Sequence, residues 1–269
     1  MSKVILVLSD GLRYDSAVAG MGTLGHMVEA KLASLYMVTG ELPSLSRPMY
    51  ETIHTGLPAH THGILSNGVV RLSNQPNVFR LARDAGLTTA AAAYYWFSEL
   101  YNRAPFDRIE DREVDDPHLP IQHGRFYTQD DYPDIELFAA AGTLVRRFAP
   151  DYLLVHPMGM DYVGGLHGAD SPGYRNHAIH QDAWLSTYLI EWLERGYTVL
   201  VSADHGMNVD GLHGGTLPEV RQVPLYLIRP GVPGLGDTRA TVSQLQMAPT
   251  LCRLLGLAVP EGMTSAALV

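Results

Sequence analysis

The chain has 269 residues, 46% of them hydrophobic, and a formal net charge of -9 at pH 7. A chain of this length can bury a large core, so it fits one domain that carries a small insertion. The negative charge argues against a protein that coats nucleic acid or an anionic membrane, and an anionic substrate would need locally supplied positive charge. Cys252 is the only cysteine, which excludes an intrachain disulfide and a cysteine-based zinc cluster.

Short apolar runs alternate with helix-like segments along the chain. Three of the runs lack polar alternation, as do parallel strands that are covered on both faces. Two amphipathic segments each end at a glycine, a common stop for a helix. The alternation predicts one α/β domain over residues 1–269, with a mostly parallel central sheet flanked by helices. The predicted strands are 3–10, 87–95, 151–159, 197–206 and 223–230, and the predicted helices are 77–86 and 183–196.

Residues 99–134 differ from the rest of the chain. They are rich in Asp, Pro, His and Tyr and show no clear period, which predicts an insertion or cap above the sheet. The longest strongly apolar stretch, residues 87–97, is about half a membrane span, and the apolar run near the N-terminus is too short for a signal-peptide core. We therefore expect a soluble, cytoplasmic protein without membrane contact, and the oligomeric state stays open.

Acidic side chains follow three of the predicted strands. Asp10 ends "VILVLSD", Asp161 ends "HPMGMD", and the pair Asp204 and His205 follows "VLVSA". Because the functional crevice of an open α/β sheet lies outside the carboxyl ends of its strands, we expect these side chains to share one site. A strand-end Asp is also a common helix N-cap, but three such ends, one with a neighbouring His, favour a metal site.

Two histidines in glycine-rich segments add to this set. His167 lies in "GGLHGAD" and His213 in "GLHGG", where glycine lets the backbone fold closely around an ion. Each of these histidines is equally consistent with a structural role in its loop. Taken together, the Asp and His side chains indicate two divalent cations, with zinc or manganese favoured over magnesium.

The stretch "PSLSRPMYETIHTG" supplies a hydroxyl group. Ser46 precedes a short helical segment with Pro48 in its first turn, so Ser46 is either the N-cap of that helix or a nucleophile. A hydroxyl at a helix N-terminus beside a cation is the place where an alkoxide is most stabilised. The residues alone leave both alternatives open.

Six short motifs together resemble the alkaline phosphatase superfamily, and most closely its nucleotide pyrophosphatase/phosphodiesterase branch. They are "LSDG", "PSLSRP", "HGILSN", "ADHGM", "HGG" and "QMAPTLCRLLGL", and they extend over almost the whole chain. The resemblance implies a nucleophile at Ser46, where this branch usually has threonine, and implies that Asn67 donates to a phosphate oxygen. It also implies two metal sites, one formed by Asp10, Ser46, Asp204 and His205, the other by Asp161, His213 and a further histidine.

One position departs from the pattern of the family. The family usually has a histidine four residues after the Asp of the second site, and this chain has Gly165 there, within "DYVGGLHG". We expect His167 to substitute as the ligand. This requires an irregular loop from Tyr162 to His167, favoured by the Gly164-Gly165 pair, because six residues along a helix amount to a rotation of roughly 240°. The alternative is a second site that is weak, occupied differently or empty.

The resemblance implies a metal-dependent phosphodiesterase or nucleotide pyrophosphatase that acts on a small-molecule phosphate ester or nucleotide through a phosphoseryl intermediate on Ser46. Asn67 and the Arg47 amide are expected to donate to phosphate oxygens. The Arg47 side chain either holds a distal phosphate or lies solvated at the surface. A phosphomonoesterase, a phosphonate hydrolase and a non-catalytic binding module remain alternatives. A sulfatase is disfavoured, because the fourth residue after Ser46 is Tyr50 where a sulfatase has arginine.

Overall fold

A nine-stranded sheet forms the centre of the fold in the computed structural model, which describes residues 3–269. The strand order across the sheet is β4-β5-β3-β6-β1-β7-β8-β2-β9. In chain order the strands are β1 (Lys3–Leu8), β2 (Ala33–Thr39), β3 (Thr89–Tyr94), β4 (Glu113–Asp115), β5 (His123–Tyr127), β6 (Tyr152–Val155), β7 (Tyr197–Ser202), β8 (Gln222–Ile228) and β9 (Gly236–Ser243).

Parallel pairing dominates the sheet, as the sequence predicts. The strands β5, β3, β6, β1 and β7 are successive parallel neighbours, and Val4 of β1 pairs with Tyr152 on one side and Thr198 on the other. Strand β8 is antiparallel to both β7 and β2, while β9 is parallel to β2. The sequence analysis did not predict β2 and β9, because polar residues interrupt their apolar runs. The predicted mostly parallel sheet flanked by helices is confirmed.

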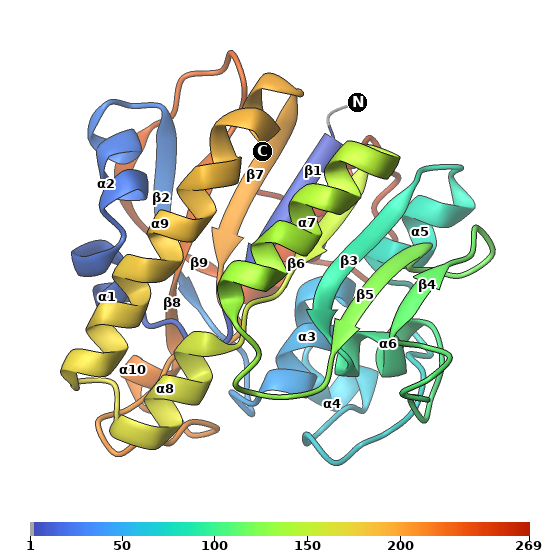
Figure 1. Ribbon diagram of the computed structural model, residues 1–269, viewed down its shortest axis with the longest axis horizontal. Helices are drawn as coiled ribbons and strands as arrows, with labels where there is room; N and C mark the ends of the chain where they lie inside the picture. The colour runs from blue at the N-terminus through green and yellow to red at the C-terminus, as the bar shows by residue number, and fades with distance from the viewer. Residues whose placement is uncertain (1–2) are drawn as a thin grey trace.

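Helices cover both faces of the sheet (Figure 1). Helices α7 and α9 cross the face turned toward the viewer, and α1, α2 and α8 pack against α9. On the other face α11 contacts α3, α5 and β1. Within residues 3–269 no helix has both the length and the apolar character needed to span a bilayer. The helices are α1 (Tyr14–Gly20), α2 (Gly22–Glu29), α3 (Ser46–Thr55), α4 (Ala59–His62), α5 (Val78–Asp84), α6 (Trp96–Tyr101), α7 (Asp134–Phe148), α8 (Gly159–His167), α9 (Pro172–Glu194), α10 (Pro218–Arg221) and α11 (Met247–Leu255), with a 3-10 turn η1 (Gln244–Gln246).

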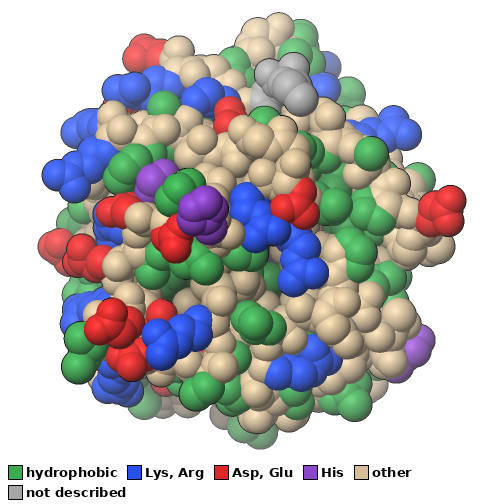
Figure 2. Space-filling view, turned by 90° about the vertical axis from the view of Figure 1, so that its right-hand side faces the viewer, with side chains coloured by type: hydrophobic (Ala, Val, Ile, Leu, Met, Phe, Trp, Pro, Cys, Tyr) green, Lys and Arg blue, Asp and Glu red, His purple; other side chains and the backbone are tan. Residues whose placement is uncertain are grey.

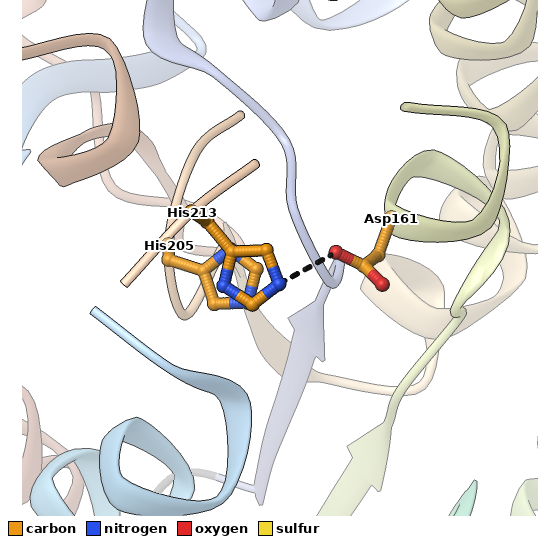
Figure 3. Close-up of side chains that lie close together, drawn as sticks. All are labelled: Asp161, His205 and His213. Atoms are coloured by element: carbon orange, nitrogen blue, oxygen red, sulfur yellow. Dashed lines mark ion pairs between the residues drawn. The ribbon is translucent and has the colours of Figure 1, made fainter. Parts of the chain in front are cut away.

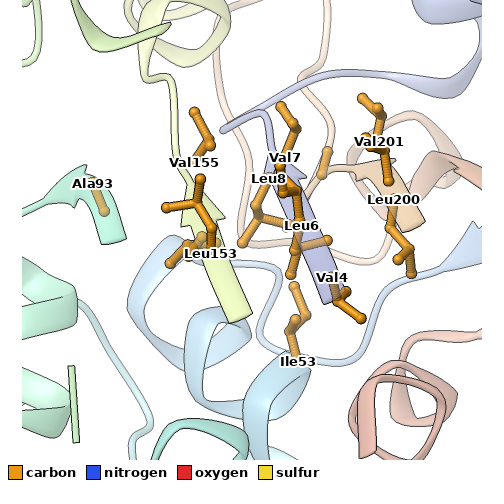
Figure 4. Packing of buried hydrophobic residues seen from close by; sticks show 14 of the residues in the cluster. Val4, Leu6, Val7, Leu8, Ile53, Ala93, Leu153, Val155, Leu200 and Val201 are labelled. Carbon is orange, nitrogen blue, oxygen red and sulfur yellow. The ribbon is translucent and has the colours of Figure 1, made fainter. Parts of the chain in front are cut away.

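The central strands are buried along their length. Val4, Leu6 and Leu8 of β1 are fully buried, and so are the residues of β6 and β7 on either side. Figure 4 shows the apolar side chains of these three strands side by side, in one cluster with Ile53 of α3. Each such side chain contributes about 1.5–3 kcal/mol to folding. Because helices cover both faces, these strands need no polar alternation.

Residues 99–134 extend the sheet, whereas the sequence predicted a cap above it. β5 pairs in parallel with β3, and β4 pairs antiparallel with β5 at the edge. These strands are too short and too polar to give a readable period. Arg125 of β5 lies 2.9 Å from Asp115 of β4, and acidic and basic side chains are interspersed on this side of the molecule (Figure 2). Charged side chains at an edge strand disfavour pairing with another chain.

Helix α3 is buried at all ten of its residues. Its second turn carries Glu51, a fully buried side chain whose carboxylate accepts a hydrogen bond from Ser73 Oγ. The other carboxylate oxygen, Oε2, has no hydrogen-bond partner among residues 3–269. Burial raises the pKa of Glu51 from 4.5 to about 7. The carboxyl group is therefore largely protonated below neutral pH.

This raised pKa makes the stability of the fold depend on pH. Because the pKa of Glu51 is higher in the folded chain than in the unfolded chain, its stabilising contribution is complete below the unfolded value of 4.5 and is lost as the pH rises through about 7. Glu51→Gln cannot ionise. We expect the difference in unfolding free energy between this variant and the wild type to shift in favour of the variant by on the order of 3 kcal/mol as the pH rises from about 5 to about 8. Urea unfolding at a series of pH values measures this, and parallel curves for the two proteins would contradict it.

Candidate metal centre and nucleophile

The predicted strand-end side chains meet at one edge of the sheet. Asp10 lies just after β1, Asp204 and His205 lie just after β7, and Asp161 lies in the first turn of α8, which follows β6. Because β6, β1 and β7 are adjacent parallel strands, their carboxyl ends lie side by side. In Figure 1 this edge is the lower side of the sheet, next to α3 and α8.

The first candidate metal site consists of Asp10, Asp204 and His205, all of them fully buried. His205 Nε2 lies 3.2 Å from Asp10 Oδ1 and 3.3 Å from Asp204 Oδ2. Ser46 Oγ lies 3.1 Å from the same nitrogen. The fold thus brings together all four side chains that the sequence predicts for this site.

The second candidate metal site consists of Asp161, His205 and His213, whose ligand atoms lie within 4.8 Å of one another. His213 Nε2 is 3.5 Å from Asp161 Oδ1. The His205 and His213 rings are stacked, with centroids 3.8 Å apart and planes inclined by 11°. In Figure 3 the two imidazoles lie together and Asp161 faces them from α8. His205 therefore stands between the two candidate sites.

The carboxylates of the two sites are crowded around one imidazole. Asp10 Oδ1, Asp161 Oδ1 and Asp204 Oδ2 are buried and have no hydrogen-bond partner among residues 3–269. Burial and the charge of Asp10 raise the pKa of Asp161 to about 7, and they raise the pKa of Asp204 well above its usual range. Burial alone would lower the pKa of His205, but the carboxylates raise it to about 10. Bound cations would neutralise this concentrated negative charge, so the donor set fits divalent metal ions.

Both imidazoles present the nitrogen that a metal needs. His205 Nδ1 lies 2.9 Å from the Gly206 carbonyl oxygen, and His213 Nδ1 lies 3.0 Å from the Ser44 carbonyl oxygen. A hydrogen on each Nδ1 can be donated to these carbonyls, so Nε2 is the nitrogen of each ring that faces an ion, and an ion bound to His205 would displace the proton from its Nε2. Burial, followed by the charge on His205, lowers the pKa of His213 to about 4, so its ring is neutral at pH 7.

Two side chains that the sequence analysis did not assign to the site orient Asp10. The Tyr50 hydroxyl donates to Asp10 Oδ2, and His156 Nε2 lies 3.3 Å from the same oxygen. Burial would raise the pKa of Asp10, but His156 and His205 hold it below its usual value. With Oδ2 engaged, Oδ1 is the oxygen next to His205. The available signals were the place of His156 at the end of β6 and that of Tyr50 one helical turn after Ser46.

Ser46 is the first residue of α3 and not its N-cap. Leu45 occupies the cap position with extended backbone angles (φ −118°, ψ 148°), and no side chain caps the helix. The N-cap alternative for Ser46 is therefore wrong. Its hydroxyl lies instead beside His205, at the positive end of the helix dipole, where a negatively charged oxygen is stabilised.

Arg47 does not have the position that the sequence analysis expected. Its side chain is 1% exposed, Nη2 lies 2.7 Å from Glu99 Oε2, and the guanidinium stacks 4.5 Å from the centre of the Trp96 ring. The Arg47 amide donates to Asn67 Oδ1 at 3.0 Å. Neither group is therefore directed at a substrate. Since Oδ1 of Asn67 accepts this bond, its Nδ2 hydrogens are the ones that can reach a phosphate oxygen.

The predicted irregular loop from Tyr162 to His167 is wrong, because α8 continues to His167. Gly164 serves close packing, because a Cβ at this position would lie 3.0 Å from Met207 Cγ. Six residues along this helix rotate His167 by roughly 240° from Asp161. The His167 side chain is exposed and belongs to neither group of candidate ligands found in residues 3–269. The structure therefore does not bring His167 to the second site.

Comparison with known proteins identifies the family. Residues 4–209 match the type I phosphodiesterase / nucleotide pyrophosphatase family, and this range includes Ser46 and both carboxylates of the first site. The chain belongs to this family. The resemblance to the alkaline phosphatase superfamily is confirmed, and so is the expectation of an enzyme that acts on phosphoester bonds. His213 lies beyond the matched range.

Two curated relatives align with nearly the whole chain. GPI ethanolamine phosphate transferase 3, catalytic subunit, of Homo sapiens is 32% identical over 97% of this chain and 25% of its own length. The protein of the same name from Mus musculus is 26% identical over 98% of this chain and 25% of its own length. The chain thus spans about a quarter of the length of these relatives.

Solved structures share the fold at low sequence identity. Murine ectonucleotide pyrophosphatase / phosphodiesterase 5, an inactive variant in complex with AMP, superposes with a TM-score of 0.76 at 15% identity, covering 97% of this chain and 96% of that one. A phosphonate monoester hydrolase from Silicibacter pomeroyi superposes with a TM-score of 0.66 at 15% identity, covering 100% of this chain and 76% of that one. These likenesses support the alkaline-phosphatase-like fold.

Substitution separates His213, which lies in the second site, from His167, which does not. We expect His213→Ala to weaken zinc binding at least about 10-fold, because loss of a residue that only hydrogen-bonds a metal ligand already costs that much. His167→Ala should leave zinc binding unchanged. Calorimetric titration of zinc into the chelator-treated chain measures both. Equal weakening of zinc binding by the two substitutions would contradict the position of His167 described above.

Proposed function

We propose that this chain hydrolyses phosphate diesters or nucleotide pyrophosphates through a phosphoseryl intermediate on Ser46. The observation that carries the proposal is the position of the Ser46 hydroxyl, 3.1 Å from His205 Nε2 at the N-terminus of α3. A serine is a weak nucleophile unless its surroundings stabilise the alkoxide. Here a helix N-terminus and two groups of candidate metal ligands surround it.

The ligand types support two divalent cations, zinc or manganese. Asp10, Asp204, His205 and the Ser46 oxygen would hold the first, and Asp161 with His213 would hold the second. When bound, such cations would lower the pKa of the serine hydroxyl and stabilise the negative charge on the phosphate oxygens. The acidic chain offers little other positive charge here, since the Arg47 guanidinium is paired with Glu99.

The remaining steps use side chains of this protein. The Ser46 hydroxyl releases its proton to water and Oγ attacks phosphorus, so that the Oγ–P bond forms while the bond to the leaving alcohol or phosphate oxygen breaks, and that oxygen takes a proton from water. Asn67 Nδ2 donates to a phosphate oxygen, and the Arg47 amide holds Asn67 in place through Oδ1. Water then breaks the Oγ–P bond, which releases phosphate monoester and restores the serine.

Transfer to an alcohol is the second candidate reaction. The relatives from Homo sapiens and Mus musculus are named as ethanolamine phosphate transferases, and they align with 97% and 98% of this chain. The same serine would serve such a reaction if an alcohol, in place of water, attacked the phosphoseryl group. A phosphomonoesterase and a phosphonate hydrolase are the further alternatives.

Substitution of the nucleophile tests the mechanism. Ser46→Ala should fold normally, because the Ser46 side chain does not cap α3. Its turnover of bis(p-nitrophenyl) phosphate should fall about a thousandfold or more, since the phosphoseryl bond cannot form. Ser66→Ala, an exposed serine next to Asn67, is the matched control and should keep wild-type turnover. Near-normal hydrolysis by Ser46→Ala would rule out the phosphoseryl route.

A substrate and product profile separates the candidate reactions. With zinc or manganese, we expect bis(p-nitrophenyl) phosphate and nucleotide pyrophosphates to react faster than p-nitrophenyl phosphate, and we expect water to be the acceptor when glycerol is present. Faster cleavage of the monoester would indicate a phosphomonoesterase, and a glycerol phosphoester product would indicate a transferase. No turnover of any of these substrates, with metal bound, would contradict the proposed hydrolysis of phosphate diesters and nucleotide pyrophosphates.

A further inference from the structure

The surface of α8 beside Asp161 carries no side chain at position 165. Gly165 follows Asp161 by four residues, and residues four apart on a helix lie on the same face. A Cβ built on Gly165 meets no heavy atom within 4 Å beyond its chain neighbours and its own helix. Gly164, by contrast, is packed against Met207, so only Gly165 borders open space.

The other polar groups near Asp161 do not replace this missing side chain. His167 is turned away on the same helix. The charge of Asp130 is one of the causes that raise the pKa of Asp161, but Asp130 Oδ1 accepts a hydrogen bond from the Tyr94 hydroxyl at 2.8 Å. Among residues 3–269, the ligand atoms grouped with Asp161 are those of His205 and His213.

The two candidate sites therefore differ in the number of donors. Asp10, Asp204 and His205 converge within 4.8 Å, with Ser46 Oγ next to His205. The other site consists of Asp161, His213 and His205, and His205 also belongs to the first site. A zinc site that performs catalysis ordinarily has three protein ligands and one open position. The second site falls short of three ligands of its own.

We propose that the two metal sites are unequal: the first binds a divalent cation tightly, and the second, held by Asp161 and His213, binds one weakly and takes its other ligands from water and from the phosphate oxygens of the substrate. This inference rests on the proposed function, because it assigns the open positions to a phosphate ester. The second cation and the phosphate group then raise each other's affinity, as linkage requires.

Titration of the chelator-treated chain with zinc chloride, and separately with manganese chloride, tests the inequality. For the wild type we expect two binding constants that differ by at least about 10-fold. Gly165→His should tighten the weaker constant by at least about 10-fold and leave the stronger one unchanged. Gly165→Ala is the matched control: it adds helix propensity and no ligand, so both constants should stay at the wild-type values.

The outcomes distinguish this inference from the proposed function. Two equally tight constants in the wild type, or equal tightening by Gly165→Ala and Gly165→His, would overturn the inequality and leave the nucleophile assignment intact. No binding of zinc or manganese by the wild type would overturn the metal-dependent mechanism itself. If Gly165→His does not fold, Gly165→Asp offers a shorter ligand at the same position. The two binding constants of the wild type test the inequality without any variant.

Discussion

The constraint on which the site depends is the crowding of three carboxylates, two of them fully buried, around one imidazole. Asp10, Asp161 and Asp204 cannot all be charged at this distance without compensating positive charge, which is why burial and mutual repulsion raise the pKa of two of them. Chain segments far apart in sequence must be held rigidly to keep such groups together. Adjacent parallel strands do this, because their carboxyl ends are fixed by the hydrogen bonds of the sheet and by a core that covers both faces.

The first site could be predicted from sequence because its signal is local. A buried strand is a continuous apolar run, and the residue at which the run stops, such as Asp10 or Asp204, lies at the functional edge. The supporting residues gave weaker signals: His156 also follows an apolar strand and Tyr50 lies one helical turn after Ser46, but neither position shows which side chain it contacts. Tyr50 and His156 reach Asp10 from other elements, and the pairing of Arg47 with Glu99 joins the start of α3 to α6, so these contacts exist only after the chain has folded.

The wrong prediction at α8 has a physical explanation. A Gly-Gly pair lowers helix propensity, and the sequence alone gives no reason for the pair except a loop. In the folded chain tertiary contacts outweigh that propensity: α8 lies so close to Met207 and Tyr174 that a Cβ at position 164 would crowd both side chains. The polar, irregular segment 99–134 was mistaken for a cap for a related reason, since short edge strands are defined by their neighbours and not by their own pattern.

The two hydrogen bonds that join α3 to the loop after α4 have a further consequence for motion. The Arg47 amide holds Asn67, and Ser73 Oγ is held by the buried carboxylate of Glu51 one turn further along the same helix. Ser73 in turn donates its amide to the Leu100 carbonyl. The loop is thus fastened near both ends, and it cannot open as an independent flap without breaking buried hydrogen bonds. Release of Asn67 from the Arg47 amide removes a hydrogen bond at the first turn of the helix that carries Ser46, so the positions of the proposed nucleophile and the proposed phosphate-oxygen donor are linked.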